Sequence, residues 1–208
     1  MIKGVVFDMD GVLFDTESLS EKLLKDIFLQ QGEVLSDDCF RSILGVTTVT
    51  SRRIITEAYP RFDYDKMLAC WNESMQRHVL EKGIPLKKGV PEVLHRLRKK
   101  GIKVGLATST QRKMVELYFE KAGFEGLFDA MVCGAEAEKG KPAPDVYLKC
   151  AELMGLAPET CAGVEDSFNG VKAVRAAGMF SIMVPDIIPY GDGHKPFVDE
   201  VLNDLTEL

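Results

Sequence analysis

Two aspartates separated by one residue directly follow the first apolar run of the chain. Residues 5–7, Val-Val-Phe, lead into Asp8 and Asp10, and Gly11 comes next. A short, β-branched apolar run that ends at a turn residue is typical of a strand buried on both faces of a parallel sheet. Ligands of open α/β sheets bind at the carboxyl ends of the strands, so these acids are placed for chemistry. Because Asp-Gly is also ordinary turn chemistry, the pair alone does not establish a site.

Polar side chains recur where the later apolar runs end. They are Thr108 and Ser109 after residues 102–107, Lys141 a short loop after residues 130–133, and Glu165 and Asp166 after residues 160–164. The carboxyl ends of parallel strands share one edge of a sheet, so we expect all of these groups to converge. Four carboxylates would repel an anion, but a divalent cation and one lysine would let the set bind Mg²⁺ and a phosphate together. Each residue also has a structural alternative, as a helix cap or a solvated loop charge, yet the joint pattern favours a site.

The spacing of apolar residues predicts the helices and strands that must position these groups. Between residues 16 and 83 the apolar spacing is helical in four stretches and predicts a small α-helical unit. Beyond it, helices and strands alternate: helices over 90–100, 114–122, 144–154, 169–177 and 196–205, strands over 102–107, 130–133, 160–164 and 180–184. This alternation predicts an α/β fold, a doubly wound parallel sheet with a Rossmann-like core and an inserted α-helical cap. The expected domains are 1–15 with 84–208, and 16–83.

Composition narrows the classes of function. The 208 residues are 46% hydrophobic and 28% charged, with a net charge of −6. This balance is typical of a globular protein, and it provides no basic face for nucleic acid. No window approaches the roughly 20 apolar residues of a membrane helix, so we expect a cytoplasmic protein without membrane contact. The five cysteines include no C-x-x-C pair and are expected to be reduced thiols.

Taken together, the motifs resemble those of the haloacid dehalogenase-like hydrolases. In chain order they read Asp8-Met9-Asp10-Gly11-Val12, Ala107-Thr108-Ser109, Lys141-Pro142-Ala143-Pro144-Asp145 and Val164-Glu165-Asp166-Ser167. The resemblance covers essentially the whole chain and is greatest to the members with a helical cap after the first strand, the phosphatases and β-phosphoglucomutases. An aspartate at position 10 is typical of phosphoryl transfer, since a dehalogenase has no leaving alkoxide to protonate.

The resemblance implies a role for each polar residue. Asp8 would attack phosphorus and form an aspartyl phosphate, and Asp10 would protonate the leaving oxygen and then activate water. Mg²⁺ would be bound by the Asp8 carboxylate, the Asp10 carbonyl and Asp166, with Glu165 as a further ligand or a supporting residue. The phosphoryl oxygens would be bound by Thr108, the Ser109 amide and Lys141.

Substrate specificity is expected to depend on the helical cap, whose sequence is the hardest part of the chain to interpret. In this family the cap closes over the site and contacts the leaving group, which implicates Thr16, Ser20, Thr48 and Arg52. The chain crossings near 15–16 and 83–85 are expected to act as hinges. The related mutases carry an Arg and a His in the cap, and the matching positions appear as Thr48 and Ser20. Arg52 or Arg53 could replace the missing Arg, so mutase activity stays open as the second interpretation.

We therefore expect a monomeric, Mg²⁺-dependent phosphatase that hydrolyses a small phosphomonoester, a sugar phosphate in particular. The alternatives are β-phosphoglucomutase-type phosphoryl transfer and, from another class, a non-enzymatic phospho-receiver or binding protein. A receiver places its phosphorylated aspartate on the third strand and has no helical insertion. A silent binding protein would normally have lost one of the acids. Multiple turnover of p-nitrophenyl phosphate with Mg²⁺ separates an enzyme from either.

Overall fold

The computed structural model describes residues 1–46 and 48–208. The chain divides into two compact units, one made of Met1–Asp15 with Ile84–Leu208 and the other of Thr16–Gly83. Within the described ranges, no helix combines the length and the apolar character needed to span a bilayer. The first unit is α/β and contains all the strands of the described chain, so the predicted fold class is confirmed.

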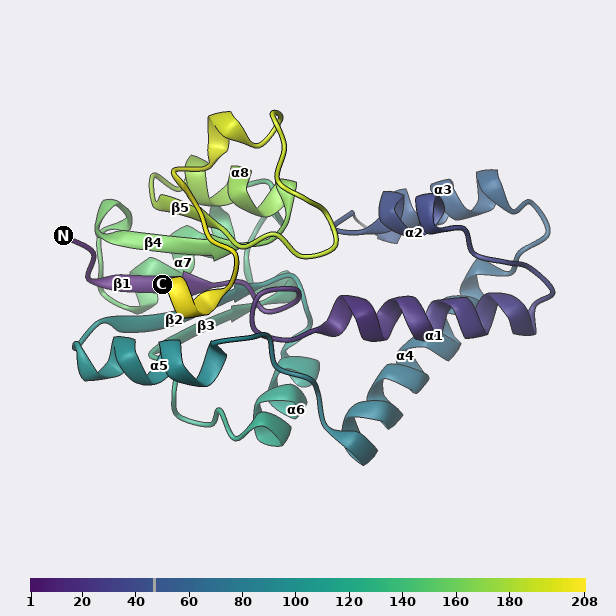
Figure 1. Ribbon diagram of the computed structural model, residues 1–208, viewed down its shortest axis with the longest axis horizontal. Coiled ribbons are helices and arrows are strands. Elements are labelled where there is room, and N and C mark those ends of the chain that lie inside the picture. The colour runs from purple at the N-terminus through teal and green to yellow at the C-terminus, as the bar shows by residue number, and fades with distance from the viewer. Residues whose placement is uncertain (47) are drawn as a thin grey trace. The chain divides into compact units, whose positions relative to one another are not determined.

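A parallel sheet forms the centre of the first unit (Figure 1). Among the described residues it has six strands in the order β3-β2-β1-β4-β5-β6. Their bounds are β1 Gly4–Phe7, β2 Lys103–Thr108, β3 Ala130–Cys133, β4 Cys161–Glu165, β5 Phe180–Met183 and β6 Glu200–Val201. All four residues of β1 are buried, as the apolar run predicts for a strand with neighbours on both sides. The chain therefore runs outward from β1 in both directions, which is the doubly wound arrangement.

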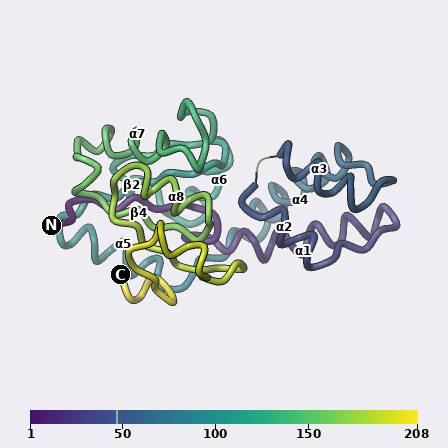
Figure 2. The backbone as a smooth tube through the Cα atoms, turned by 90° about the horizontal axis from the view of Figure 1, so that it is seen from above, coloured from purple at the N-terminus to yellow at the C-terminus, as the bar shows by residue number. Residues whose placement is uncertain are grey.

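Helices cover both faces of this sheet. They are α5 Val90–Lys99, α6 Arg112–Ala122, α7 Asp145–Leu153 and α8 Phe168–Ala176. In Figure 2, α5 and α7 lie on opposite sides of the strands. Helices α7 and α8 share one face, where a core cluster joins Val6 and Val132 of the sheet to Tyr147 and Val174 of the helices. Gly105 and Gly163 keep this face close to the helices, since a Cβ at either would lie 2.5 Å from Cys150 or Val174.

The second unit contains four helices within its described residues: α1 Thr16–Gln30, α2 Asp37–Ile43, α3 Thr48–Ala58 and α4 Tyr64–Lys82. Helix α1 buries an apolar stripe that includes Leu24 and Phe28, and the Phe28 ring stacks on Phe62 at 3.9 Å. Side-chain caps start two of the helices. Ser36 accepts from the Cys39 amide ahead of α2, and Asp63 accepts from the Lys66 amide ahead of α4.

The predicted helix over 196–205 is wrong. The segment instead forms 3-10 turns at Lys195–Phe197 and Leu205–Glu207 with the short strand β6 between them. The cause is pairing with the sheet edge: the Asp199 amide donates to the Ser181 carbonyl at 2.8 Å, and the Leu202 amide donates to the Met183 carbonyl at 2.9 Å. Backbone pairing along β5 therefore overrides the local apolar spacing.

Candidate active site

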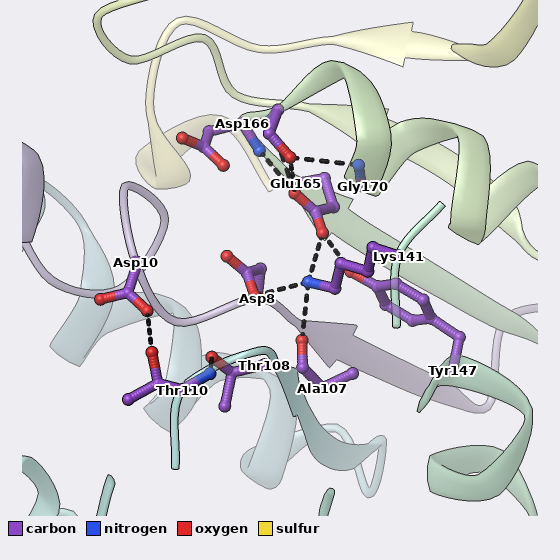
Figure 3. Close-up of polar contacts among 11 residues, drawn as sticks. Asp8, Asp10, Ala107, Thr108, Thr110, Lys141, Tyr147, Glu165, Asp166 and Gly170 are labelled. Carbon is purple, nitrogen blue, oxygen red and sulfur yellow. Dashed lines mark hydrogen bonds and ion pairs between the residues drawn. The ribbon is translucent and has the colours of Figure 1, made fainter. Parts of the chain in front are cut away.

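The strand register places Asp8 among the other residues that were predicted to form the site. Phe7 of β1 pairs with Leu106 of β2 and with Val164 of β4, so the residues that follow each strand emerge side by side. The Asp8 amide continues this pairing and donates to the Val164 carbonyl at 2.9 Å. Asp8 thus lies at the carboxyl edge of the sheet, between the end of β2 and Glu165 (Figure 3).

Lys141 is held at this edge by three oxygen atoms. Its ammonium lies 2.6 Å from Asp8 Oδ1, 2.6 Å from Glu165 Oε1 and 3.0 Å from the Ala107 carbonyl. Only 8% of the Lys141 side chain is exposed to solvent. The three acceptors fix the position of the charge, so Lys141 is directed at the carboxylate of Asp8 rather than solvated in a loop.

Glu165 is fully buried, and both of its oxygens are hydrogen-bonded. Besides Lys141, its Oε1 accepts from the Tyr147 hydroxyl at 2.7 Å. Its Oε2 accepts from the Ser167 hydroxyl at 3.1 Å and from the Asp166 amide at 3.2 Å. A Cβ at Gly170 would lie 1.8 Å from the Glu165 carboxyl carbon, so the helix passes too close for any other residue there. This geometry favours Glu165 as a support for Lys141 over a direct metal ligand.

The acids fit a divalent metal ion. Asp8, Glu165 and Asp166 each offer a carboxylate oxygen, and these oxygens all lie within 4.8 Å of one another. Because both Glu165 oxygens already accept hydrogen bonds, Asp8 and Asp166 are the candidate ligands. Hard oxygen donors at this spacing suit Mg²⁺. Gly11 makes room for one of them: it has φ of 75°, and a Cβ there would lie 2.2 Å from Asp166 Oδ2. The turn after β1 therefore requires glycine for its conformation and for the close approach of Asp166.

Asp10 is held by the turn that follows β2. The Thr110 hydroxyl donates to Asp10 Oδ2 at 2.6 Å, and the Thr110 amide donates to the Thr108 hydroxyl oxygen at 3.0 Å (Figure 3). Thr108 is buried, whereas Ser109 is exposed at the turn that follows. The turn after β2 thus links the hydroxyl of Thr108 to the side chain of Asp10.

Burial and neighbouring charges together set the pKa values of Asp8 and Lys141. Removal from water raises the pKa of Asp8 to about 8; the Lys141 charge lowers this pKa, and the Glu165 and Asp10 charges raise it. For Lys141, burial alone would lower the pKa, but the charges of Asp8 and Glu165 outweigh it and the pKa is raised. Lys141 therefore stays cationic, while Asp8 needs a further positive charge to be fully ionised near neutral pH.

The four predicted cap residues lie in the Thr16–Gly83 unit, and Ser20, Thr48 and Arg52 make polar contacts within it. The Trp71 indole donates to the Ser20 hydroxyl at 2.9 Å, and the Thr48 carbonyl accepts from the Tyr64 hydroxyl at 3.3 Å. Thr16 begins α1 and is buried. Arg52 forms a two-pronged ion pair with Asp65 and lies over the Tyr64 ring, 4.4 Å from its centroid. Its guanidinium is thus already paired within the unit.

Two residues at the site were missed from the sequence. Thr110 belongs to the Thr-Ser-Thr cluster after β2, so its hydroxyl was visible, but only the turn geometry shows that it reaches Asp10. Tyr147 lies in α7 and its partner Glu165 ends β4. No local sequence pattern predicts the contact between Tyr147 and Glu165, because it depends on how α7 packs against the sheet.

Known proteins share this fold and this arrangement of strands. The model for haloacid dehalogenase-like hydrolases matches residues 5–184. Phosphorylated carbohydrates phosphatase of Thermotoga maritima is 33% identical, over 86% of this chain and 82% of that protein. Hexitol phosphatase B of Escherichia coli is 32% identical, over 100% of this chain and 94% of that protein. The structure of CbbY from Rhodobacter sphaeroides in complex with phosphate has a TM-score of 0.80 at 25% identity, over 100% of this chain and 96% of that one.

The chain belongs to the haloacid dehalogenase-like hydrolases. Within that class it is a phosphoric monoester hydrolase, as its relatives among the phosphatases indicate. The predicted family and enzyme class are therefore confirmed, whereas the metal, the ester and the role of each side chain are matters of proposal.

Proposed function

We propose that the chain is a Mg²⁺-dependent phosphatase that hydrolyses the phosphomonoester of a small sugar or sugar alcohol through an aspartyl phosphate at Asp8. The observation that carries this proposal is the buried contact of 2.6 Å between Lys141 and Asp8, with Asp10 and Asp166 at the same sheet edge. The names of two relatives, a phosphorylated carbohydrates phosphatase and a hexitol phosphatase, support the class of substrate.

In the first half-reaction, an Asp8 oxygen attacks phosphorus and the bond from phosphorus to the leaving oxygen breaks. Lys141 contacts Oδ1 of Asp8, so Oδ2 lies outside that ion pair. Lys141 and the Thr108 hydroxyl stabilise the charge on the transferring phosphoryl oxygens. Asp10, oriented by Thr110, gives its proton to the departing alkoxide. The products are the free alcohol and a phosphorylated Asp8.

In the second half-reaction, water attacks the phosphorylated Asp8 and Asp10 takes the proton of that water. The bond from phosphorus to Asp8 breaks, inorganic phosphate leaves, and both aspartates return to their starting states. The Mg²⁺ ion, held by Asp8, the Asp10 carbonyl and Asp166, would neutralise the charge shared by carboxylate and phosphate. Glu165 keeps Lys141 in place throughout, as a support.

Turnover assays test the proposal. The enzyme should release phosphate from p-nitrophenyl phosphate for many cycles with Mg²⁺, and chelation should stop it. A panel of sugar and sugar-alcohol phosphates then identifies the ester. A single stoichiometric phosphorylation, or turnover indifferent to chelators, would contradict the proposal.

The cationic side chains of residues 16–83 favour hydrolysis over mutase chemistry. A mutase must bind a second, non-reacting phosphate, and this calls for an available cation in the cap. Positions 48 and 20 carry Thr and Ser. Of the two arginines that could replace the missing Arg, Arg52 is paired with Asp65, and Arg53 lies 3.5 Å from Glu57. Phosphorus NMR of β-glucose 1-phosphate with a trace of the 1,6-bisphosphate separates the two activities. Glucose 6-phosphate accumulating faster than inorganic phosphate would make the protein a mutase.

A further inference from the structure

A second carboxylate–lysine pair lies beside the candidate active site: Asp186 is in the loop after β5, and Lys87 precedes α5. Asp186 Oδ1 is 2.5 Å from the Lys87 ammonium, and 11% of the Asp186 side chain is exposed. The other oxygen, Oδ2, is buried and has no hydrogen-bond partner among the described residues. A buried carboxylate oxygen without a donor is costly, so this atom calls for a partner that binding supplies.

The backbone places Asp186 next to Asp166. The Val184 amide donates to the Glu165 carbonyl at 2.8 Å, so the loop after β5 runs alongside the end of β4. Both carboxylates border the same point: a Cβ at Gly11 would lie 2.2 Å from Asp166 Oδ2 and 3.3 Å from Asp186 Oδ2. The unpartnered oxygen of Asp186 therefore lies on the side of Gly11 that faces the candidate metal ligand Asp166.

Each of the two lysines pairs with a different carboxylate. Lys141 neutralises the buried Glu165, and Lys87 contacts only one oxygen of Asp186. In proteins Mg²⁺ keeps several of its waters, and carboxylates of the outer shell accept hydrogen bonds from them. A water bound to the metal ion is the donor that suits an unpartnered oxygen at this position.

We propose that Asp186 is an outer-shell positioning residue of the Mg²⁺ site, whose Oδ2 accepts a hydrogen bond from a metal-bound water while its Oδ1 pairs with Lys87. This inference rests on the proposed Mg²⁺ dependence. It adds to the site a residue that belongs to none of the four sequence motifs.

A purely structural role makes a different prediction. The Lys87 amide donates to the Leu13 carbonyl at 2.9 Å, so the ion pair also ties residues 84–88 and the turn after β1 to the loop after β5. If the pair acted only as this tie, loss of either partner would disturb the site equally. If Asp186 acts on the metal, loss of Asp186 weakens Mg²⁺ binding, whereas loss of Lys87 leaves a carboxylate of undiminished charge and does not weaken it.

Titration calorimetry with Mg²⁺ alone distinguishes these cases, with the variants Asp186→Asn and Lys87→Met in the full chain at pH 8. Asp186→Asn should weaken Mg²⁺ binding about 10-fold to 100-fold, as loss of an outer-shell partner does. Lys87→Met should bind Mg²⁺ as tightly as the wild type or more tightly. Asp204→Asn is the matched control, because Asp204 pairs with the neighbouring Lys88 at 2.7 Å and should leave the affinity unchanged.

Unchanged affinity in Asp186→Asn overturns this inference alone, provided that the wild type binds Mg²⁺. Equal weakening in Asp186→Asn and Lys87→Met also overturns it, in favour of the structural tie. If the wild type binds no Mg²⁺, the proposed metal dependence fails together with the inference. Circular dichroism without Mg²⁺ checks that each variant folds. Should Asp186→Asn not fold, Lys87→Met decides: weakened binding overturns the inference, and unweakened binding supports it.

Discussion

Mg²⁺ binding should release a proton from the site, and its affinity should therefore depend on pH. Burial raises the pKa of Asp8 to about 8, so in the metal-free enzyme much of Asp8 is protonated near neutral pH. A metal ligand must be ionised, so binding displaces that proton. The sign follows: affinity is lost as the pH falls below the raised pKa and is regained above it.

The magnitude follows from the same pKa. With a pKa of about 8, roughly half of Asp8 is ionised at pH 8 and roughly 1% at pH 6, so the apparent Mg²⁺ affinity should fall about 50-fold, or ~2.3 kcal/mol, over this range. About half a proton should be released per Mg²⁺ at pH 8 and about one at pH 6.

Calorimetry in two buffers with different ionisation enthalpies measures both quantities, because the apparent heat contains the heat of buffer protonation multiplied by the protons released. Asp8→Asn is the control: its amide has no proton to lose, so its residual Mg²⁺ binding should be independent of the buffer. A flat affinity between pH 6 and pH 8, with no proton release in the wild type, would refute the reasoning that burial outweighs Lys141 at Asp8.

Three further predictions address the nucleophile, the buried network and the hinge. Asp8→Asn should fold and lose turnover of p-nitrophenyl phosphate; activity within about tenfold of wild type, ~1.4 kcal/mol in the barrier, would contradict a nucleophilic role. Tyr147→Phe removes a buried hydroxyl that donates to Glu165 and should lower the free energy of unfolding in urea by about 1.5–3 kcal/mol. The control Tyr59→Phe removes an exposed hydroxyl that donates to the Val34 carbonyl and accepts from the Ser36 amide, and it should cost less because these groups can bind water instead; equal losses would argue against the buried network. Gly83→Ala strains a crossing residue with φ of 76° and should change kcat and KM together, whereas Gly32→Ala, with φ of 80° and equally open surroundings, should change neither.

Most of the fold could be predicted because each strand of the core is a short apolar run closed by a turn or polar residue. The glycine at 101 stops α5, and the glycine at 123 caps α6 in a left-handed conformation. These signals are local and needed no knowledge of the tertiary structure. Residues 196–205 behave differently: their apolar spacing is helical, yet pairing with the edge of β5 makes part of them a strand.

The side chains that meet at the sheet edge could be predicted to the extent that they follow strands. Asp8 and Glu165 end neighbouring strands, so the register alone brings them together. Tyr147 and Asp186 could not be predicted in this way. The contact of Tyr147 depends on the packing of α7, and the place of Asp186 depends on how the loop after β5 runs beside Asp166. Contacts of this kind are set by tertiary packing and leave no spacing in the sequence.

The central claim is that phosphoryl transfer passes through Asp8, and trapping the intermediate tests it most directly. The Asp10→Asn variant, which lacks the proton acceptor for water, is mixed with p-nitrophenyl phosphate and Mg²⁺, quenched in acid and reduced with borohydride, which converts an aspartyl phosphate to homoserine. Peptide mass spectrometry should then find homoserine at position 8, and none in the double variant Asp8→Asn with Asp10→Asn. A wild-type enzyme that turns over while the modified residue lies elsewhere, or while no residue is modified, would contradict the account.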